Sequence, residues 1–161
     1  RNAWIALARW NHHVERFDAS VRSSYRYYQD TFGVRSHILG LEWVQPSGRW
    51  TFTPGVRYYT QSAARFYLDP VLNAQGQYDE MGTIVRAATQ AGSKSVDQRL
   101  SAFGAVTLSL KVGYAYTPST SVDLKLEGYR QTAGLRLGGS GSPGLAPFNA
   151  RFVQVGLTHR F

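Results

Sequence analysis

Hydrophobic and polar side chains alternate through the last ten residues of the chain, 152–161. The apolar residues stand at every second position, with His159 as the interruption: Val153, Val155, Leu157 and Phe161. A period of two residues places apolar side chains on one face of a β-strand and polar side chains on the other. Chain ends usually fray into water, so a tail of this kind is unusual for a globular protein. The pattern predicts an ordered strand with two distinct faces.

The same alternation recurs in six further segments and predicts about seven antiparallel strands. Tyr25 and Tyr27 share one face of their segment, whereas Arg22 and Arg26 share the other. Pro54 removes a backbone donor, so a bulge or a locally open edge is expected beside it. The periodicity of the first segment is weak, and a short helix is the alternative there. The segments are 2–15, 17–30, 35–44, 50–61, 99–116 and 121–130.

The connections alternate in length, with short ones at 45–49 and 117–120 and long irregular ones at 62–98 and 133–149. Within the first long stretch, residues 81–91 fit either a short helix or a strand extension. Outer-membrane β-barrels have short periplasmic turns and longer extracellular loops, so both long stretches are predicted to be extracellular. The two membrane interfaces are then expected to hold aromatic side chains: Phe17, Trp43, Trp50, Tyr116 and Phe161 at the periplasmic end, and Trp4, Tyr25, Tyr27 and Tyr58 at the other.

Charged side chains in the alternating segments are assigned to the face opposite the apolar one. A charge on the lipid-facing side near the membrane midplane costs about 2–4 kcal/mol, so these residues are predicted to face a lumen. Two interpretations stand: a lumen packed with paired and hydrogen-bonded charges, or a conduit whose surplus of Arg favours anions. The predicted lumenal cluster is Arg22, Arg26, Glu42, Arg57, Tyr59, Lys111 and Arg130.

Composition narrows the class of protein. The chain has 161 residues, of which 43% are hydrophobic, and it carries a formal net charge of +8. No run approaches the roughly 18 consecutive apolar residues of a membrane helix. The cations are spread singly rather than clustered on one face, which argues against nucleic acid as a partner. The absence of cysteine excludes a disulfide framework and thiolate chemistry.

No motif for catalysis, a metal or a cofactor is recognisable in the sequence. His12 and His13 are adjacent, so they point to opposite faces of a strand and do not chelate one metal together. His37 and His159 fall on the predicted lipid-facing side. The sequence therefore predicts no enzyme and no cofactor, and an outer-membrane hydrolase with a Ser–His pair is kept as an alternative.

Two strings resemble a known family: Ser24-Tyr-Arg-Tyr-Tyr28, followed by Ser36-His37, and Gly55-Val-Arg-Tyr-Tyr-Thr-Gln-Ser-Ala-Ala-Arg-Phe-Tyr67. They resemble the core of a family of uncharacterised bacterial outer-membrane β-barrel proteins, classed as a domain of unknown function. The resemblance covers about residues 17–70 and the closing strand. It implies a location and a fold but no established activity. The alternating tail with Phe161 also resembles the signal that the barrel-assembly machinery reads.

The predicted fold is all-β: an antiparallel transmembrane β-barrel in a Gram-negative outer membrane. Because bacterial single-chain barrels have an even number of strands, residues 1–161 are expected to be the C-terminal portion of a larger, porin-like barrel. The expected function is that of a structural component or pore. The expected partners are outer-membrane lipid, the barrel-assembly machinery and other envelope proteins. The alternative from another class is a soluble β-barrel that binds a small apolar ligand, which requires the apolar face to point inward.

Overall fold

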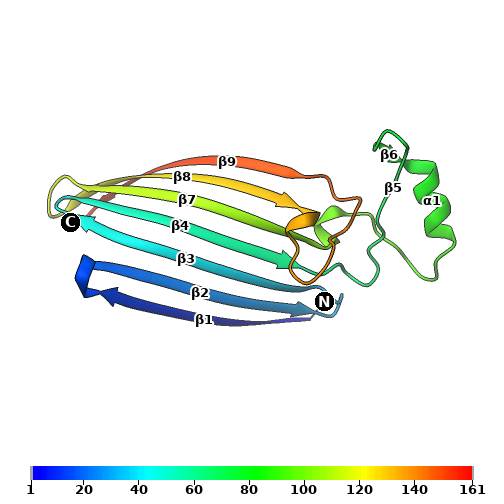
Figure 1. The fold of residues 1–161 in the computed structure, drawn as a ribbon, viewed down its shortest axis with the longest axis horizontal. Coiled ribbons are helices and arrows are strands. Elements are labelled where there is room, and N and C mark those ends of the chain that lie inside the picture. Colours follow the sequence, from blue (N-terminus) through cyan, green and yellow to red (C-terminus); the bar gives the residue numbers. More distant parts are fainter. Residues whose placement is uncertain (1, 161) are drawn as a thin grey trace.

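The computed structural model describes residues 2–160, and most of them lie in one antiparallel β-sheet (Figure 1). The seven predicted strands are present, and the first is a strand rather than a helix. The strand order is β1-β2-β3-β4-β7-β8-β9, and every neighbouring pair is antiparallel. The strands are β1 (Ala3–Val14), β2 (Ala19–Asp30), β3 (Arg35–Ser47), β4 (Trp50–Gln61), β7 (Phe103–Ala115), β8 (Thr120–Thr132) and β9 (Phe148–His159).

Most strand ends follow the predicted alternation, and the exceptions have local causes. Phe17 belongs to a short 3₁₀ helix, Glu15–Phe17, and not to a strand. Asp18 then takes a left-handed conformation with φ of 46°, so β2 begins at Ala19, two residues later than predicted. At the other end of the chain, β9 starts at Phe148, four residues before the alternation becomes visible, because residues 148–151 pair with β8.

Pro54 interrupts the pairing of β3 with β4 without producing a bulge. Glu42 pairs with Gly55 and Gln45 pairs with Phe52, so the register is the same on both sides of the interruption. On its other side β4 pairs continuously with β7, with Pro54 opposite Leu110. Of the two predicted alternatives, the locally open edge is the one observed, because proline lacks the donor but fits the extended backbone.

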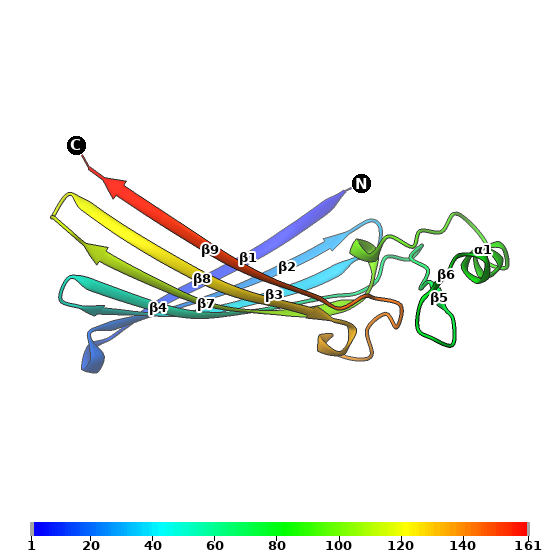
Figure 2. The ribbon, with the colours of Figure 1, turned by 90° about the horizontal axis from the view of Figure 1, so that it is seen from above.

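The sheet is bent into a trough and does not close on itself (Figure 2). Its two outer strands, β1 and β9, rise on the same side, and within the described residues each pairs with one neighbour only. These seven strands therefore form an open, curved wall, and no closed barrel is present.

The two ends of the wall differ, as the connection lengths predicted (Figure 1). One end, called the turn end below, carries the short connections 15–18, 48–49 and 116–119. The opposite, loop end carries the long connections 62–102 and 133–147.

The first long connection contains more structure than the sequence pattern indicated. It holds a small hairpin of β5 (Val71–Leu72) and β6 (Tyr78–Asp79), followed by helix α1 (Glu80–Ala88). Asp79 caps this helix by accepting a hydrogen bond from the backbone N–H of Gly82. The short-helix alternative for residues 81–91 is thus confirmed. Among residues 2–160, no helix is long and apolar enough to cross a membrane.

Buried apolar side chains gather at the loop end, where the long connections fold over the strand ends. The sheet itself buries little, because one layer of strands has no second layer against it. The buried hydrophobic residues of this cap are Val34, Ala64, Leu68, Ala102, Phe103 and Leu145.

Two glycines on neighbouring strands differ in how closely the cap packs against them. A Cβ on Gly104 of β7 would lie 1.9 Å from the carbonyl oxygen of Leu135, whereas a Cβ on Gly128 of β8 would meet open space. We expect Gly104→Ala to lower the free energy of unfolding by at least about 1–3 kcal/mol, since the added methyl group would push the backbone at Leu135 away from β7. Gly128→Ala, the matched control, is expected to change it by less than about 1 kcal/mol. Urea unfolding of both variants measures this, and equal losses would contradict the packing described.

Candidate functional site

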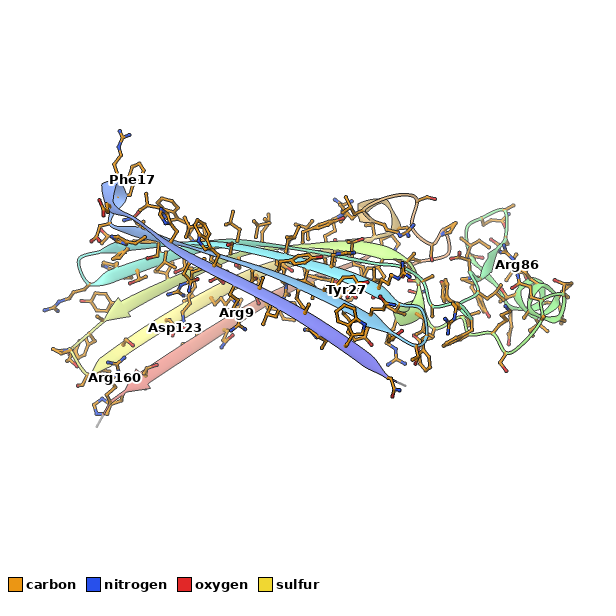
Figure 3. All side chains as sticks on the ribbon, turned by 90° about the horizontal axis from the view of Figure 1, so that it is seen from below. Arg9, Phe17, Tyr27, Arg86, Asp123 and Arg160 are labelled. Carbon is orange, nitrogen blue, oxygen red and sulfur yellow. The ribbon has the colours of Figure 1, made fainter. Side chains whose placement is uncertain are left out.

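The strand register sorts the side chains of the sheet into two faces of opposite character. The convex face carries rows of large apolar residues, such as Leu41 opposite Val56 and Leu110 opposite Leu126. These side chains are strongly exposed: Leu108 is 62% exposed and Val153 71%. The concave face carries most of the charged and hydroxyl-bearing residues (Figure 3), with Arg9 and Asp123 inside the curve and Phe17 on its outer side.

Six of the seven residues of the predicted lumenal cluster share the concave face. Arg22 stands opposite Glu42, Arg57 opposite Gly40, and Tyr59 opposite Ile38, which in turn pairs with Arg26. Lys111 follows on β7, opposite Thr53 and Lys125. The members are Arg22, Arg26, Glu42, Arg57, Tyr59 and Lys111.

Arg130 is the exception, and its assignment to the cluster is wrong. It stands opposite Val106 on one side and Asn149 on the other, in the row that continues into Leu126 and Leu124. Its position has the same parity as these leucines, so the period of two residues places it on the convex face. Arg130 therefore lies outside the trough.

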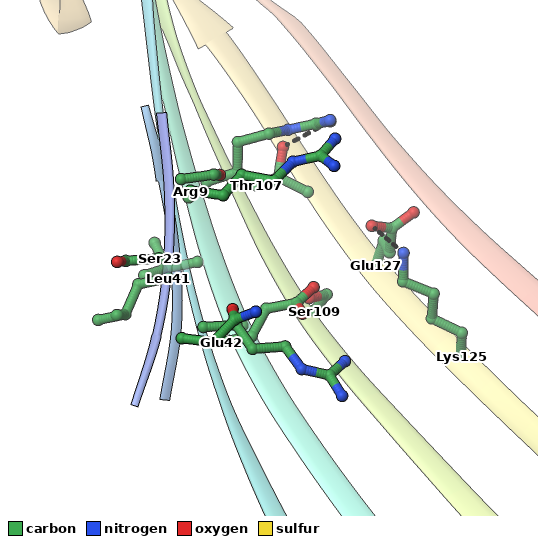
Figure 4. Close-up of a pocket in the computed structure, with 15 residues that line it drawn as sticks. Arg9, Ser23, Leu41, Glu42, Thr107, Ser109, Lys125 and Glu127 are labelled. Atoms are coloured by element: carbon green, nitrogen blue, oxygen red, sulfur yellow. Dashed lines mark hydrogen bonds and ion pairs between the residues drawn. The ribbon is translucent and has the colours of Figure 1, made fainter. Parts of the chain in front are cut away.

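A cavity of about 600 Å³ lies at the centre of the concave face (Figure 4). Its floor is made of small residues. Gly40 has no room for a larger side chain, since a Cβ there would lie 2.7 Å from the Oγ of Ser24. Gly55 and Ser109 continue this floor on the next two strands. Longer side chains from both halves of the sheet enclose the space: Arg9, Arg22, Glu42, Arg57, Lys125 and Glu127.

The lysines and arginines of this face differ in their partners. Lys111 Nζ lies 3.4 Å from a carboxylate oxygen of Asp123, and Lys125 Nζ lies 3.0 Å from Glu127. Arg57 Nη2 donates to the hydroxyl of Thr107 at 3.5 Å. Within residues 2–160, no carboxylate lies at salt-bridge distance from the concave-face arginines: Arg9, Arg22, Arg26 and Arg57. The surplus of positive charge is thus carried by guanidinium groups.

Sequence patterns missed part of this face. Arg9 was overlooked because apolar residues occur on both sides of β1, as with Leu7 on the concave face and Trp10 on the convex face. The sequence patterns also missed tyrosines at the loop end that donate a hydrogen bond to the residue two positions further along the chain. Tyr28 donates to Asp30 at 2.9 Å and Tyr129 to Gln131 at 2.6 Å. A recurring Tyr-x-Gln or Tyr-x-Asp pair, which Tyr59 and Gln61 also form, is the signal that would have found them.

Aromatic residues of the convex face gather at both ends of the strands, as predicted. At the turn end, Phe17 contacts Trp43 edge-on at 5.9 Å between ring centroids, and Trp50 lies 4.6 Å from Tyr114. At the loop end, the rings of Trp4 and Tyr27 are 5.4 Å apart. Tyr58 lies on the same face, three residues before the end of β4. Tyr25 also lies on this face, but it stands in the middle of β2 and not at its end.

The closing strand presents its alternating tail on the convex face. Val153, Val155 and Leu157 stand opposite three apolar residues of β8 and lie at the free edge of the sheet. Phe161, the fourth residue of the predicted assembly signal, lies outside the described residues. Recognition by the assembly machinery stays a prediction.

The Arg-Tyr-Tyr string that carried the family resemblance joins β4 to the loops at the loop end. Gln61 is buried and donates from Nε2 to the carbonyl oxygens of Arg99 and Ser101 at 3.0 and 2.6 Å. Thr60 accepts a hydrogen bond from the N–H of Leu137 at 3.0 Å. Tyr58 donates to the carbonyl oxygen of Leu135 at 2.5 Å. These bonds reach both long connections.

The second half of the same string binds the connection between β2 and β3. Ser62 Oγ accepts from the N–H of Arg35 at 2.9 Å and donates to the carbonyl oxygen of Gly33. Arg65 donates to the carbonyl oxygen of Thr31. The ring of Phe66 packs edge-on against Phe32 at 5.1 Å. The string therefore anchors the cap, with Thr60 and Gln61 as its buried, hydrogen-bonded polar side chains.

Comparison with known families finds an uncharacterised family. A family model described as "Protein of unknown function (DUF3570)" matches residues 1–152. The chain belongs to this family. The match includes both strings and the first five residues of β9. No curated protein and no solved structure matches the chain. The DUF3570 description assigns no activity.

Metal-ligating side chains are dispersed in the described part of this DUF3570 chain. Among residues 2–160, no group of three His, Asp or Glu side chains is placed to hold a metal ion. Three of the four histidines contact aromatic or hydroxyl groups: His12 stacks on Trp10, His37 bonds the hydroxyl of Tyr25, and His159 bonds that of Thr120. The fourth, His13, has its Nε2 3.6 Å from a carboxylate oxygen of Asp18. The absence of an enzyme activity stays a prediction.

Tyr67 is a buried titratable group of the cap whose pKa is shifted. Burial raises the pKa of the Tyr67 hydroxyl to about 12, and the nearby Asp69 carboxylate adds to this. The hydroxyl is buried without a hydrogen-bond partner among the described residues. Tyr67 therefore stays neutral at physiological pH and acts in packing.

Gln61 provides a direct test of the anchor. We expect Gln61→Leu to destabilise the cap by about 1–3 kcal/mol, since the carbonyl of Ser101 and the hydroxyl of Tyr59 are left buried without this partner. Limited proteolysis should then cleave residues 62–98 faster. Gln131→Leu is the control, because Gln131 receives one bond, from Tyr129, and reaches no loop carbonyl. Equal cleavage rates in both variants would contradict the anchoring role.

Proposed function

We propose that this chain forms much of the wall of a transmembrane β-barrel in a Gram-negative outer membrane, with an arginine-rich lumen. The observation that carries the proposal is the polarity of the sheet. Its convex face is apolar and exposed, and its concave face is charged and encloses a cavity of about 600 Å³. Water-soluble proteins rarely leave so large an apolar surface exposed, whereas a membrane barrel requires it on the outside.

The dimensions of the sheet agree with a membrane span. A transmembrane β-strand needs about 9–11 residues when tilted, and the strands of this sheet have 12 or 13. The convex aromatic clusters lie near the two strand ends, where interfaces are expected. The short turns at one end and long loops at the other are typical of outer-membrane barrels and support placing the loops outside.

The edges of the sheet constrain how such a barrel closes. Six antiparallel pairings separate β1 from β9, so these two strands run in the same direction. Direct pairing of the two edges would be parallel. An all-antiparallel barrel therefore needs an odd number of additional strands between β9 and β1, which gives the even total typical of bacterial barrels. These strands come from further parts of the same polypeptide or from another chain.

The lumen is proposed to be structural or to conduct ions with a preference for anions. Lys111 and Lys125 have carboxylate partners, which is the arrangement of a braced wall. Among the described residues, the concave arginines have no carboxylate partner. They supply positive potential along the same surface, which favours anions in a pore. The alternative of a soluble barrel with an apolar ligand inside loses support, because the interior face is the charged one.

Detergent dependence tests the location. We expect the full-length protein to fractionate with outer membranes, to require detergent for solubility, and to migrate faster on gels before boiling than after it. This follows because a closed barrel resists unfolding by dodecyl sulfate until it is heated. Release of folded protein by high salt without detergent would overturn the proposal.

Single-channel recording separates a pore from a brace. We expect the full-length protein in a planar bilayer to conduct chloride better than potassium, and Arg22→Gln with Arg57→Gln to reduce this selectivity several-fold, since both guanidiniums line the cavity. Arg130→Gln with Arg151→Gln removes the same charge from the convex face, outside the trough, and serves as the control. A folded protein that does not conduct would support the structural role.

A further inference from the structure

The charged residues of the convex face are confined to one end of the sheet. Among the described strand residues of this face, three are Lys, Arg, Asp or Glu, and all three are arginines: Arg35, Arg130 and Arg151. Arg35 begins β3, Arg130 stands two residues before the end of β8, and Arg151 is the fourth residue of β9. Each therefore lies near the loop end.

Arg130 and Arg151 form a pair on neighbouring strands. Arg130 stands opposite Asn149, and Arg151 stands opposite Gly128, so the two arginines are diagonal neighbours on the same face. Both are exposed. Among residues 2–160, no carboxylate lies at salt-bridge distance from either. Two guanidiniums this close on an apolar face repel each other unless an anion joins them.

The surface beside this pair is hollowed. Gly128 contributes no side chain between Leu108 and Arg151, and a Cβ there would meet open space. The resulting groove has a volume of about 980 Å³ and continues past Val106 to Leu135. It combines an apolar floor with two cations and the amide of Asn149 at its rim. An occupant with both an anionic group and a hydrocarbon portion complements it.

Depth in the membrane explains why these charges are tolerated. An arginine on the lipid-facing side costs about 2–4 kcal/mol at the midplane but about 0–1 near an interface. The positions of Arg130 and Arg151 near the strand ends correspond to the interface. Phosphate is the anion expected there, and arginine binds it through paired N–H donors.

We propose that Arg130, Arg151 and the groove over Gly128 bind the phosphate and the adjoining acyl chain of an anionic lipid in the leaflet at the loop end. This inference rests on the proposed function, which places the loop end outside. The outer leaflet of a Gram-negative outer membrane consists largely of lipid A, which carries phosphates. Lipid A is therefore the occupant to which the proposal commits, and the groove is the reason to prefer it to free phosphate.

The test uses full-length protein in a neutral detergent. Diphosphoryl lipid A in the same detergent is titrated against wild type and Arg130→Gln/Arg151→Gln, and bound lipid is counted by native mass spectrometry. We expect about tenfold weaker binding to the variant, since two charge-assisted contacts are lost. Lipid A without phosphates should bind wild type about as weakly. Arg16→Gln/Arg49→Gln, with the same loss of charge at the turn end, should bind like wild type.

A second variant tests the groove without changing charge. Gly128→Leu fills the space between Leu108 and Arg151 and keeps both arginines. We expect it to weaken lipid A binding several-fold, whereas inorganic phosphate added as a competitor should have little effect at millimolar concentration. Full displacement by inorganic phosphate would overturn the assignment to lipid.

The outcomes separate this inference from the proposed function. If the protein is soluble without detergent, the proposed function fails and the lipid site fails with it. If the protein is a detergent-dependent, heat-modifiable barrel and binds lipid A equally with and without Arg130 and Arg151, only the lipid site fails. Folding of each variant is checked by the gel shift, so a loss of binding is read only from folded protein.

Discussion

The structure depends on register: seven strands must pair so that the apolar residues of each fall in the same rows. Because side chains alternate with a period of two, a slip of one residue would carry every leucine of a strand to the concave side. The observed pairing keeps Leu41 beside Val56 and Leu126 beside Val153. It also keeps Arg22 beside Glu42 on the other face. One constraint thus produces both the apolar exterior and the charged trough.

A single curved sheet has no second layer to bury, so the chain obtains its core elsewhere. The cap at the loop end supplies it, where Leu68, Phe103 and Leu145 are buried beneath the long connections. Polar side chains hold the cap in place, and Gln61 and Thr60 bond the backbone of two separate connections. In physical terms, the Arg-Tyr-Tyr string of this chain is therefore a set of loop anchors.

The distribution of charge follows from the solvent proposed for each face. On the concave face, Lys125 pairs with Glu127 while Arg57 is left with a hydroxyl partner, so this surface is both braced and positive. On the convex face, the charged side chains of the described strand residues lie only near the loop end, as with Arg130. The proposed membrane location, with an anionic outer leaflet, would explain the position of the convex arginines.

The alternation in the sequence determined the strands, their antiparallel order and the two faces, because a period of two residues is local and survives any arrangement of the sheet. It predicted β4 to the residue, and it placed Arg22 and Arg57 on one side. It failed on β1, where apolar residues occur on both faces, and Arg9 was therefore missed. It also failed for Arg130, which was assigned to the concave face although its position matches that of the convex leucines. The alternation also did not predict the structure of the 62–98 connection, because α1 and the β5–β6 hairpin are too short to show a clear period.

Tertiary structure alone decided which face is concave, which arginines meet across the trough, and where the buried core lies. These properties depend on the twist of the whole sheet and on contacts between residues far apart in the chain, such as Gln61 with Ser101 and Arg9 with Arg57 around one cavity. The tail at 152–161 illustrates the division. Its alternation determined a two-faced strand, whereas its place at an open edge, parallel in direction to β1, follows only from the pairing of all seven strands.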